Sequence, residues 1–361
     1  IYVGGWQDGV RHGEGSYTHP NGESYEGSWK QGIKHGYGVW IQSTGEKYAG
    51  GFKEGLFSNQ GTLTYSDGGI YVGGWQDGVR HGEGSYTRSN GETYVGSWEN
   101  DQKHGQGTLT YIDGENYVGS WKRGVMDGHG TYRFANGEVY IGDIKGGSLN
   151  GRGEWFHPSG EKYIGGFLGG WFDGQGTYSY TDGGTYSGLW SKNVRDGWGT
   201  FNYRNGDSYV GEWQGGLRHG EGTLTYSDGG VYVGEWQDGV RHGKGSFTTD
   251  KFVYTGEFEG GKQAGYGTEK YLNSSSDISS DYTGEFANGV PNGQGIFTTS
   301  EGYRYVGDYK DGMFDGEGIL TYPNGFRQVG MWKSNKFWQG VEYDKEGHLL
   351  AEYSQGLRKD M

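Results

Sequence analysis

The chain has 361 residues, of which 80 are glycine, and its hydrophobic fraction is only 31%. Glycine enrichment is typical of disordered or collagen-like chains, but four prolines and 17% aromatic residues argue against both classes. A formal net charge of −14 disfavours sequence-independent binding to nucleic acid, because few counterions could be displaced from phosphates. Cysteine is absent, so neither a disulfide framework nor a thiolate metal site can form. Aromatic residues spread evenly among glycines predict many thin, repeated cores.

A tyrosine that recurs with a period of 23 residues defines an internal repeat. The run at 1–18 returns unchanged at 70–87, three repeats later. The period predicts fifteen repeats, numbered in chain order, which begin near Tyr2, Tyr25, Tyr48, Tyr71, Tyr94, Tyr117, Tyr140, Tyr163, Tyr186, Tyr209, Tyr232, Tyr254, Tyr282, Tyr305 and Gln328. The predicted array occupies 1–342, its last repeat is degenerate, and 343–361 form a C-terminal tail.

The first half of each repeat has the spacing Tyr-x-Gly-x-Trp, as at Tyr2, Gly4 and Trp6. A period of two places these three residues on one face of a β-strand. β-Branched residues such as Val3 lie between them and suit an extended backbone. The glycine between two large rings leaves a gap, and we expect a ring from a neighbouring strand to lie across it.

The second half of each repeat begins with Gly-x-Gly, as at Gly13 and Gly15, and continues with an aromatic residue or leucine. Asn-Gly and Asp-Gly dipeptides then supply the positive φ angles of tight hairpin turns, at Asn21-Gly22, Asn90-Gly91, Asp113-Gly114 and Asn136-Gly137. Each repeat is thus predicted to be one β-hairpin. Because a lone hairpin is only marginally stable, consecutive hairpins must pair edge to edge.

The predicted fold class is therefore all-β. We expect an elongated, single-layer antiparallel sheet of about fifteen tandem hairpins, twisted into a rod, with no helix before about residue 348. The period is interrupted at 250–281, where repeat 11 is one residue short and repeat 12 is five residues longer. A polar loop at 272–280 is expected to be mobile, and the interruption is a candidate bend between repeats 1–11 and 12–15.

The string Tyr-x-Gly-x-Trp-x-x-Gly-x-x-His-Gly-x-Gly resembles the MORN repeat (membrane occupation and recognition nexus), and it is read at Tyr2–Gly15, Tyr25–Gly38, Tyr71–Gly84, Tyr209–Gly222 and Tyr232–Gly245. The resemblance covers nearly the whole chain. It implies a β-hairpin array used in protein scaffolding, in dimerisation or in attachment to membrane phospholipids. A MORN-only chain is similar to cytoskeletal scaffolds of apicomplexan and trypanosomatid parasites and to MORN proteins of cilia and flagella. A zinc-bridged Cys/His dimer, which occurs among such scaffolds, is not implied, because cysteine is absent.

Six histidines occupy one position of the repeat, where other repeats have aspartate or asparagine before a glycine: His12, His35, His81, His104, His219 and His242. Residues of this set share the ability to cap a turn, which we favour over a metal site or a pH switch. Asp-Gly-x-Gly strings resemble calcium-binding β-rolls, but those have a nonapeptide period. No unique set of Ser, His and Asp residues occurs, so the sequence predicts neither an enzyme nor a cofactor site.

The residue before the histidine position is basic in seven repeats, at Arg11, Lys34, Arg80, Lys103, Arg195, Arg218 and Arg241. In repeats 6–8 it becomes Met126, Leu149 and Phe172, with Trp171 adjacent. If this position is exposed at the loop edge, these four side chains form an apolar patch that binds a partner protein. The alternative is that they tuck under their own loops.

The same position is apolar again at Phe314 and Phe337, and Trp338 follows the latter. A terminal hairpin has an open edge that must be capped or paired. We therefore predict that these three residues form either a cap or a dimer contact, and we favour homodimerisation through the C-terminal repeats.

Acidic residues stand three residues after the repeat tyrosine in the C-terminal half, at Glu212, Glu235, Glu257, Glu285 and Asp308. Adjacent repeats would stack these carboxylates into a row with a spacing of roughly 10 Å. Such a row suits a basic partner segment, and it suits a solvated, solubilising face equally well.

These observations predict a non-catalytic, dimeric protein-protein interaction scaffold of the cytoskeleton or of a cilium or flagellum. We expect cytoskeletal or axonemal protein partners, no nucleic acid and a cytoplasmic location, since no signal peptide, long apolar stretch or lipidation motif is recognisable. The alternative is a phosphoinositide-binding membrane tether in which the basic positions meet an anionic lipid. The net charge of −14 opposes the attraction of about 1 kcal/mol per basic residue near such a surface.

Overall fold

The computed structural model describes residues 1–273 and 277–361. The chain divides into two compact parts, an N-terminal module (Ile1–Thr181) and a C-terminal module (Asp182–Met361). The described residues form 32 β-strands and no helix, which confirms the predicted all-β class. The tip of the loop predicted at 272–280 lies outside the described residues.

Each module is an ordered series of strands. The N-terminal module contains β1 (Tyr2–Gln7), β2 (Val10–Thr18), β3 (Ser24–Lys30), β4 (Ile33–Ile41), β5 (Lys47–Lys53), β6 (Leu56–Thr64), β7 (Ile70–Gln76), β8 (Val79–Thr87), β9 (Thr93–Glu99), β10 (Gln102–Thr110), β11 (Asn116–Lys122), β12 (Val125–Arg133), β13 (Val139–Lys145), β14 (Ser148–Phe156), β15 (Lys162–Leu168) and β16 (Trp171–Ser179). The C-terminal module contains β17 (Thr185–Ser191), β18 (Val194–Asn202), β19 (Ser208–Gln214), β20 (Leu217–Thr225), β21 (Val231–Gln237), β22 (Val240–Thr248), β23 (Phe252–Glu259), β24 (Lys262–Leu272), β25 (Ile278–Ala287), β26 (Val290–Thr299), β27 (Arg304–Lys310), β28 (Met313–Thr321), β29 (Arg327–Lys333), β30 (Lys336–Tyr343), β31 (Leu349–Ser354) and β32 (Leu357–Asp360).

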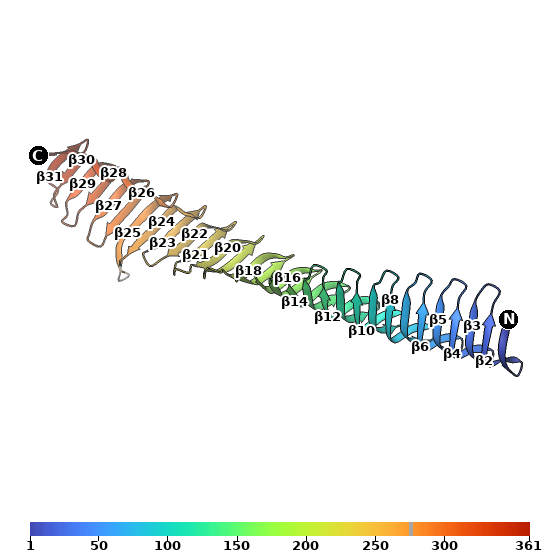
Figure 1. The fold of residues 1–361 in the computed structure, drawn as a ribbon. Coiled ribbons are helices and arrows are strands. Elements are labelled where there is room, and N and C mark those ends of the chain that lie inside the picture. The colour runs from blue at the N-terminus through green and yellow to red at the C-terminus, as the bar shows by residue number, and fades with distance from the viewer. Residues whose placement is uncertain (274–276) are drawn as a thin grey trace. The chain divides into compact units, whose positions relative to one another are not determined.

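Within each module, every strand pairs antiparallel with the next strand in the chain, so the hairpins follow one another along one sheet (Figure 1). Repeat 4 shows the register: in the β7–β8 hairpin Tyr71 lies opposite Tyr86 and Gly73 lies opposite Gly84. A β-bulge follows Gly73 and shifts the register before Trp75. The predicted tandem antiparallel hairpins are thereby confirmed.

Two kinds of turn alternate along the sheet. The two-residue turn inside each hairpin has both residues in the left-handed region, as at Asp77 (φ 52°) and Gly78 (φ 88°), which is the geometry of a type I′ turn. In the connection to the next hairpin only the glycine has a positive φ, as at Gly91 (φ 95°). There the Asn90 side-chain oxygen accepts a hydrogen bond from the Glu92 amide (3.0 Å).

The predicted positive φ angles were therefore wrong for the Asn and Asp residues of the Asn-Gly and Asp-Gly connections, which serve as side-chain acceptors or ordinary turn residues. Glycine alone has the left-handed conformation at Asn21-Gly22, Asn90-Gly91, Asp113-Gly114 and Asn136-Gly137. The type I′ turns lie at the other end of each hairpin.

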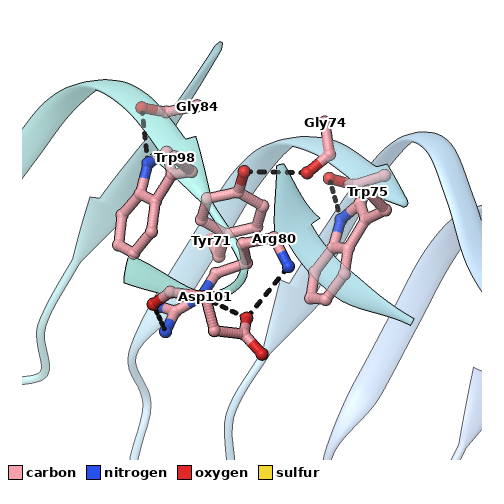
Figure 2. A network of polar contacts seen from close by, with 8 residues as sticks. Tyr71, Gly74, Trp75, Arg80, Gly84, Trp98 and Asp101 are labelled. Carbon is pink, nitrogen blue, oxygen red and sulfur yellow. Dashed lines mark hydrogen bonds and ion pairs between the residues drawn. The ribbon is translucent and has the colours of Figure 1, made fainter. Parts of the chain in front are cut away.

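The repeat tyrosines form the core, and from Tyr25 onward they are 0–2% exposed. The ring of Tyr71 lies over the paired glycines of its own hairpin, and its hydroxyl donates to the carbonyl of Gly74 (3.0 Å) (Figure 2). A Cβ on Gly84 would stand 2.4 Å from the Tyr71 hydroxyl oxygen, and a Cβ on Gly73 would stand 2.5 Å from the Gly84 Cα. The expectation that a neighbouring strand supplies the ring was wrong, because the tyrosine of the same strand covers the gap.

Successive repeats are joined by the side chains that flank each tyrosine, and in nine repeats this column residue is tryptophan. The Tyr71 ring packs edge to face against Trp75 of its own repeat (5.1 Å) and against Trp98 of the next repeat (5.3 Å). The Trp98 indole N–H also donates to the carbonyl of Gly84 across the repeat boundary (3.3 Å) (Figure 2). Aromatic pairs of this geometry are worth about 0.5–1.5 kcal/mol each beyond their buried area. The column of rings therefore links each hairpin to both neighbours.

The sheet of the C-terminal module continues through the irregular region. β22 pairs with β23, β23 with β24, and β24 with β25, where the ladder reaches Leu272 opposite Ile278. The tail predicted at 343–361 forms the hairpin β31–β32, and β31 pairs with β30. Ala351 of this hairpin is fully buried, and the Tyr353 ring packs on Phe337 (4.9 Å). The tail thus extends the sheet.

Replacing Gly84 by alanine should destabilise repeat 4 strongly. Its φ is ordinary, so the cost arises from the clash of the added methyl with the Tyr71 ring, and overpacking of this kind costs about 1–3 kcal/mol. Urea unfolding and amide exchange of 70–98 measure the change. Ser85→Ala, one residue along on the opposite face, is the matched control. Equal stability of the two variants would contradict the assigned role of the tyrosine.

Alkaline pH should unfold the array cooperatively. Burial raises the pKa of Tyr25, Tyr117 and Tyr254 to about 12 and raises the pKa of nine further repeat tyrosines: Tyr48, Tyr71, Tyr94, Tyr140, Tyr163, Tyr209, Tyr232, Tyr282 and Tyr305. An unfolded tyrosine ionises near pH ~10, so above that pH the unfolded chain releases protons that the folded chain keeps. Stability is unaffected below this window and then falls by up to about 1.4 kcal/mol per pH unit for each buried tyrosine.

The measurement is tyrosinate absorbance followed together with far-ultraviolet circular dichroism. Both signals should change in one steep step above pH ~10, whereas in concentrated guanidinium chloride the tyrosines should titrate broadly around pH ~10. Gradual ionisation of the native protein with intact β-structure would show that these hydroxyls are not held in the core.

Candidate interaction surfaces

The basic residue before the histidine position lies on the aromatic face of the sheet. The Arg80 guanidinium covers the rings of Tyr86 (5.6 Å) and Trp98 (4.2 Å). Its Nε forms an ion pair with Asp101 Oδ1 (3.0 Å) (Figure 2). A second guanidinium nitrogen donates to the Asp101 main-chain carbonyl (3.0 Å). The Arg80 side chain is only 19% exposed. It therefore clamps repeat 4 to repeat 5.

The other predicted basic residues occupy the equivalent place. Cations lie over the rings of the repeat tyrosine or the next tryptophan at Arg11, Lys34, Lys103, Arg195, Arg218 and Arg241. Arg195 and Arg218 each donate to a turn carbonyl of the next repeat, at 2.7 Å. Burial lowers the pKa of Lys103 to about 8. The structure places these cations against rings and carbonyls, so they do not line a free basic edge.

Three of the four residues predicted as a partner patch share this half-buried place. The Phe172 ring stacks on Tyr163 (3.8 Å, 14°), Met126 lies opposite Trp121, and Leu149 lies opposite Ile144. Their side chains cover the ring column where other repeats have a cation.

The fourth residue, Trp171, precedes Phe172 in β16, so it lies on the face of the sheet opposite the ring column. It borders the turn between β15 and β16 and is 53% exposed. Leu168, across the turn, is 61% exposed, and only Gly169 and Gly170 separate them. Leu168 was missed in the sequence, although its position is polar in thirteen other repeats and alanine in the fourteenth. These two side chains form an exposed apolar turn, which we name the repeat 8 tip.

The residues predicted as a cap or dimer contact also divide into two groups. Phe314 stacks on Tyr305 (3.7 Å, 5°), and Phe337 is 9% exposed and packs on Trp332. Trp338 keeps 38% of its surface exposed. Phe314 and Phe337 thus build the end of the ring column, and only Trp338 presents a surface there.

The face opposite the ring column carries an apolar row in repeats 13–15 that the sequence reasoning missed. Cross-strand pairs run from Ile296 to Val306, from Val306 to Ile319, from Ile319 to Val329, and from Val329 to Val341. We name these five residues the C-terminal apolar row. Ile319 is 42% exposed. In repeats 4–6 the same row alternates valine with serine or threonine, and this contrast was the available signal.

The predicted acidic row lies on this same opposite face, and several of its carboxylates bind the main chain at the bulge. Glu235 accepts from the Lys244 amide (3.0 Å) and Asp308 from the Glu317 amide (2.7 Å). Two hollows lie along this row: one of about 330 Å³ is lined by Glu212 and Glu235, and one of about 470 Å³ is lined by Glu235 and Glu257. In the part of the chain that the structure describes, no three His, Asp or Glu side chains are grouped to hold a metal ion.

The histidine position caps turns where it is acidic or an amide. Side-chain oxygens of Asp127, Asn150, Asp196 and Asp315 each accept an amide N–H from the turn of the next repeat, at 3.1–3.4 Å. This contact favours the turn role that the sequence predicted for this position. The described residues contain no helix with the length and hydropathy needed to cross a membrane.

Tandem hairpins that pack on one another through buried aromatic side chains within each module define a repeat scaffold. The family model of the MORN repeat matches most of this chain, and the protein belongs to the MORN repeat family. The matched residues are 2–24, 25–47, 48–70, 71–93, 94–115, 117–139, 163–185, 186–208, 209–231, 232–250, 254–276, 282–302 and 305–327. The hairpins from Tyr140 and from Gln328 are unmatched; the former has Ile144 in place of tryptophan, and the latter lacks the first tyrosine. The MORN repeat is a non-enzymatic class of binding repeat, and no catalytic family is indicated.

No curated protein matches the sequence. Among solved structures, similarity extends to the SAS-4 TCP domain of Drosophila melanogaster bound to a proline-rich motif of Ana2, with 12% identity, 49% of this chain, 90% of that chain and a TM-score of 0.29. The TCP10 domain of Danio rerio CPAP bound to a STIL peptide gives 11% identity, 94% of this chain, 98% of that chain and a TM-score of 0.14. Scores this low carry no argument about fold or function.

Proposed function

We propose that this protein is a non-catalytic scaffold of the cytoskeleton or of a cilium or flagellum, which dimerises through its C-terminal repeats and docks partner proteins along its array. The membership of the MORN repeat family and the resemblance to MORN-only scaffolds support the cellular setting. The observation that carries the dimer is the C-terminal apolar row.

The C-terminal apolar row has the same strand pairing as the other repeats but lacks their polar side chains on this face. In repeats 4–6 each valine of this row has serine or threonine as its cross-strand neighbours, as Val95 has Ser85 and Thr108, and Val39 of repeat 2 has Glu26 and Ala49. From Ile296 to Val341 the same positions are uninterrupted isoleucine and valine. Apolar area that stays in contact with water lowers stability, and a second copy of the same row removes it symmetrically. A second copy of this chain is therefore its occupant.

A partner protein is expected at the repeat 8 tip. Leu168 and Trp171 stay exposed on a turn without side chains of its own, and tryptophan anchors are enriched at the centres of protein interfaces. Phe172, next to Trp171 in the chain, fills the place on the ring-column face where other repeats have a cation, and Met126 and Leu149 do the same in repeats 6 and 7. A partner segment could therefore bury Trp171 without removing water from a charged side chain at this position of repeat 8, which is Phe172.

The alternative function, a phosphoinositide-binding tether, has less support. Arg80, Arg195 and Arg218 already donate to carbonyls of the next repeat. Reaching a lipid headgroup would cost these hydrogen bonds and the ring contacts together.

The dimer is tested by converting part of the C-terminal apolar row to the sequence of other repeats. Ile319→Thr with Val329→Thr should shift the full chain from dimer to monomer in light scattering, because the self-complementary apolar contact is lost. Threonine occurs in this row elsewhere, so the hairpins should remain folded. Phe337 is left unchanged because it is buried in the ring column.

The matched control is Val95→Thr with Val118→Thr, which changes residues of the same row in repeats 5 and 6 that are more exposed than Ile319. This variant should stay dimeric. A wild-type protein that is monomeric, or a dimer that survives the C-terminal double substitution, would refute the proposed contact.

Partner docking at the repeat 8 tip is tested by proximity labelling in ciliated or flagellated cells. Leu168→Gln with Trp171→Ser should remove a subset of cytoskeletal or axonemal proteins from the labelled set, since the apolar anchors are lost. Leu217→Gln, in the equivalent Gly-Gly turn of repeat 10, is the control because Leu217 is 50% exposed. An unchanged set, or the same loss in the control, would remove the tip as a docking site.

A further inference from the structure

A cavity of about 210 Å³ opens on the ring-column face at repeats 11–13, within the C-terminal module. The rings of Phe247, Phe252 and Phe258 form its walls, and Arg241 and Gln263 supply polar groups. No other function described above uses these residues. The cavity therefore needs its own explanation.

The cavity exists because repeat 12 has a smaller ring at a column position. Phe258 stands where nine other repeats have tryptophan. In repeat 10 the Arg218 guanidinium carbon lies 4.2 Å from the Trp236 ring, whereas Arg241 lies 5.3 Å from Phe258. The indole that would fill this space is missing, and the shorter turn of repeat 11 places Phe252 at the rim.

Arg241 differs from Arg80, Arg195 and Arg218 in its hydrogen bonds. The backbone contact is kept, since the Gly261 amide donates to the Arg241 carbonyl (3.0 Å), as the Gly239 amide does to Arg218 (2.9 Å). Yet the Arg218 guanidinium donates to Gly239, whereas among the described residues the Arg241 guanidinium has no acceptor. A half-buried guanidinium that contacts rings and has no such acceptor gains from an external acceptor.

We propose that this cavity binds a carboxylate carried on a small apolar group. The planar guanidinium of Arg241 matches a carboxylate geometrically, and the three phenylalanine rings would pack against the apolar part. An apolar cavity of about 150 Å³ is enough to hold a benzene ring, so the available volume admits one ring with its carboxylate. A bare inorganic anion would leave the phenylalanine walls unfilled. This site is independent of dimerisation and of the repeat 8 tip.

The first test is ligand-observed saturation-transfer NMR on the full chain with 3-phenylpropionate. Binding should be detected, and the uncharged 3-phenylpropanamide should bind about tenfold more weakly, because it cannot pair with the guanidinium. Equal binding of acid and amide, or no binding of the acid, would overturn the proposal. Displacement of the acid by equimolar inorganic phosphate would also overturn it, since the rings would then contribute nothing.

The second test changes the protein at two points. Phe258→Trp restores the residue of nine other repeats, so it should fold normally while filling the cavity and abolishing binding. Arg241→Gln should weaken 3-phenylpropionate about tenfold and leave the amide unchanged. Phe286→Trp makes the same ring change one repeat later, outside the cavity lining, and should bind like the wild type. Wild-type affinity in the folded Phe258→Trp or Arg241→Gln variant would contradict the assignment.

The carboxylate could come from a free aromatic acid or from the C-terminus of a protein. The two sources are distinguished by comparing 3-phenylpropionate with N-acetylglycylphenylalanine, whose carboxylate is a peptide C-terminus. Tighter binding of the peptide supports the site as one for the C-terminal residue of a partner protein. Tighter binding of 3-phenylpropionate supports it as one for a free aromatic acid.

Discussion

The structure depends on one steric constraint: each repeat tyrosine lies across two glycines on facing strands, and any side chain on these glycines would clash with its ring. Tyr71 can reach the carbonyl of Gly74 only because neither Gly73 nor Gly84 has a Cβ. The Tyr71 ring then packs against Trp75 of its own repeat on one side and against Trp98 of the next repeat on the other. A hairpin that is marginal alone is stabilised by contacts that only a neighbour can supply. The constraint therefore explains both the glycine content and the need for many repeats.

The position next to this column tolerates very different side chains. Arg80, with its charge over three rings, and Phe172, stacked flat on Tyr163, occupy equivalent places. Both side chains pack on the ring column and both are half-buried. A flat or flexible side chain can make this contact whether or not it is charged. Variation there changes stability more than recognition. In the regular repeats we therefore propose the opposite face and the turns as the binding surfaces, because the ring column does not constrain them.

The hairpin array was predictable because period, strand alternation and turn dipeptides are local properties of the sequence. Which ring covers the glycines was not, since a strand pattern places Tyr71 and Gly73 on one face but does not show how far the ring leans along it. Whether Arg80 and Phe172 lie exposed at a loop edge or covered was left open by the sequence for a related reason: their burial depends on the rings of adjacent strands, which meet them only after pairing. The C-terminal apolar row was visible only through register, because Ile296, Val306 and Ile319 are distant in sequence and adjacent across strands.

The irregular repeats show how such an array acquires a distinct site. A substitution in the column, from tryptophan to Phe258, removes volume without breaking the pairing of β22, β23 and β24. The backbone ladder holds the walls in place, so the lost volume persists as a cavity instead of collapsing. Arg241 lines that cavity and, among the described residues, lacks the carbonyl acceptor that its counterpart Arg218 has. Strand pairing depends on the backbone and core packing depends on the ring column. A local loss of ring volume therefore leaves the paired strands intact.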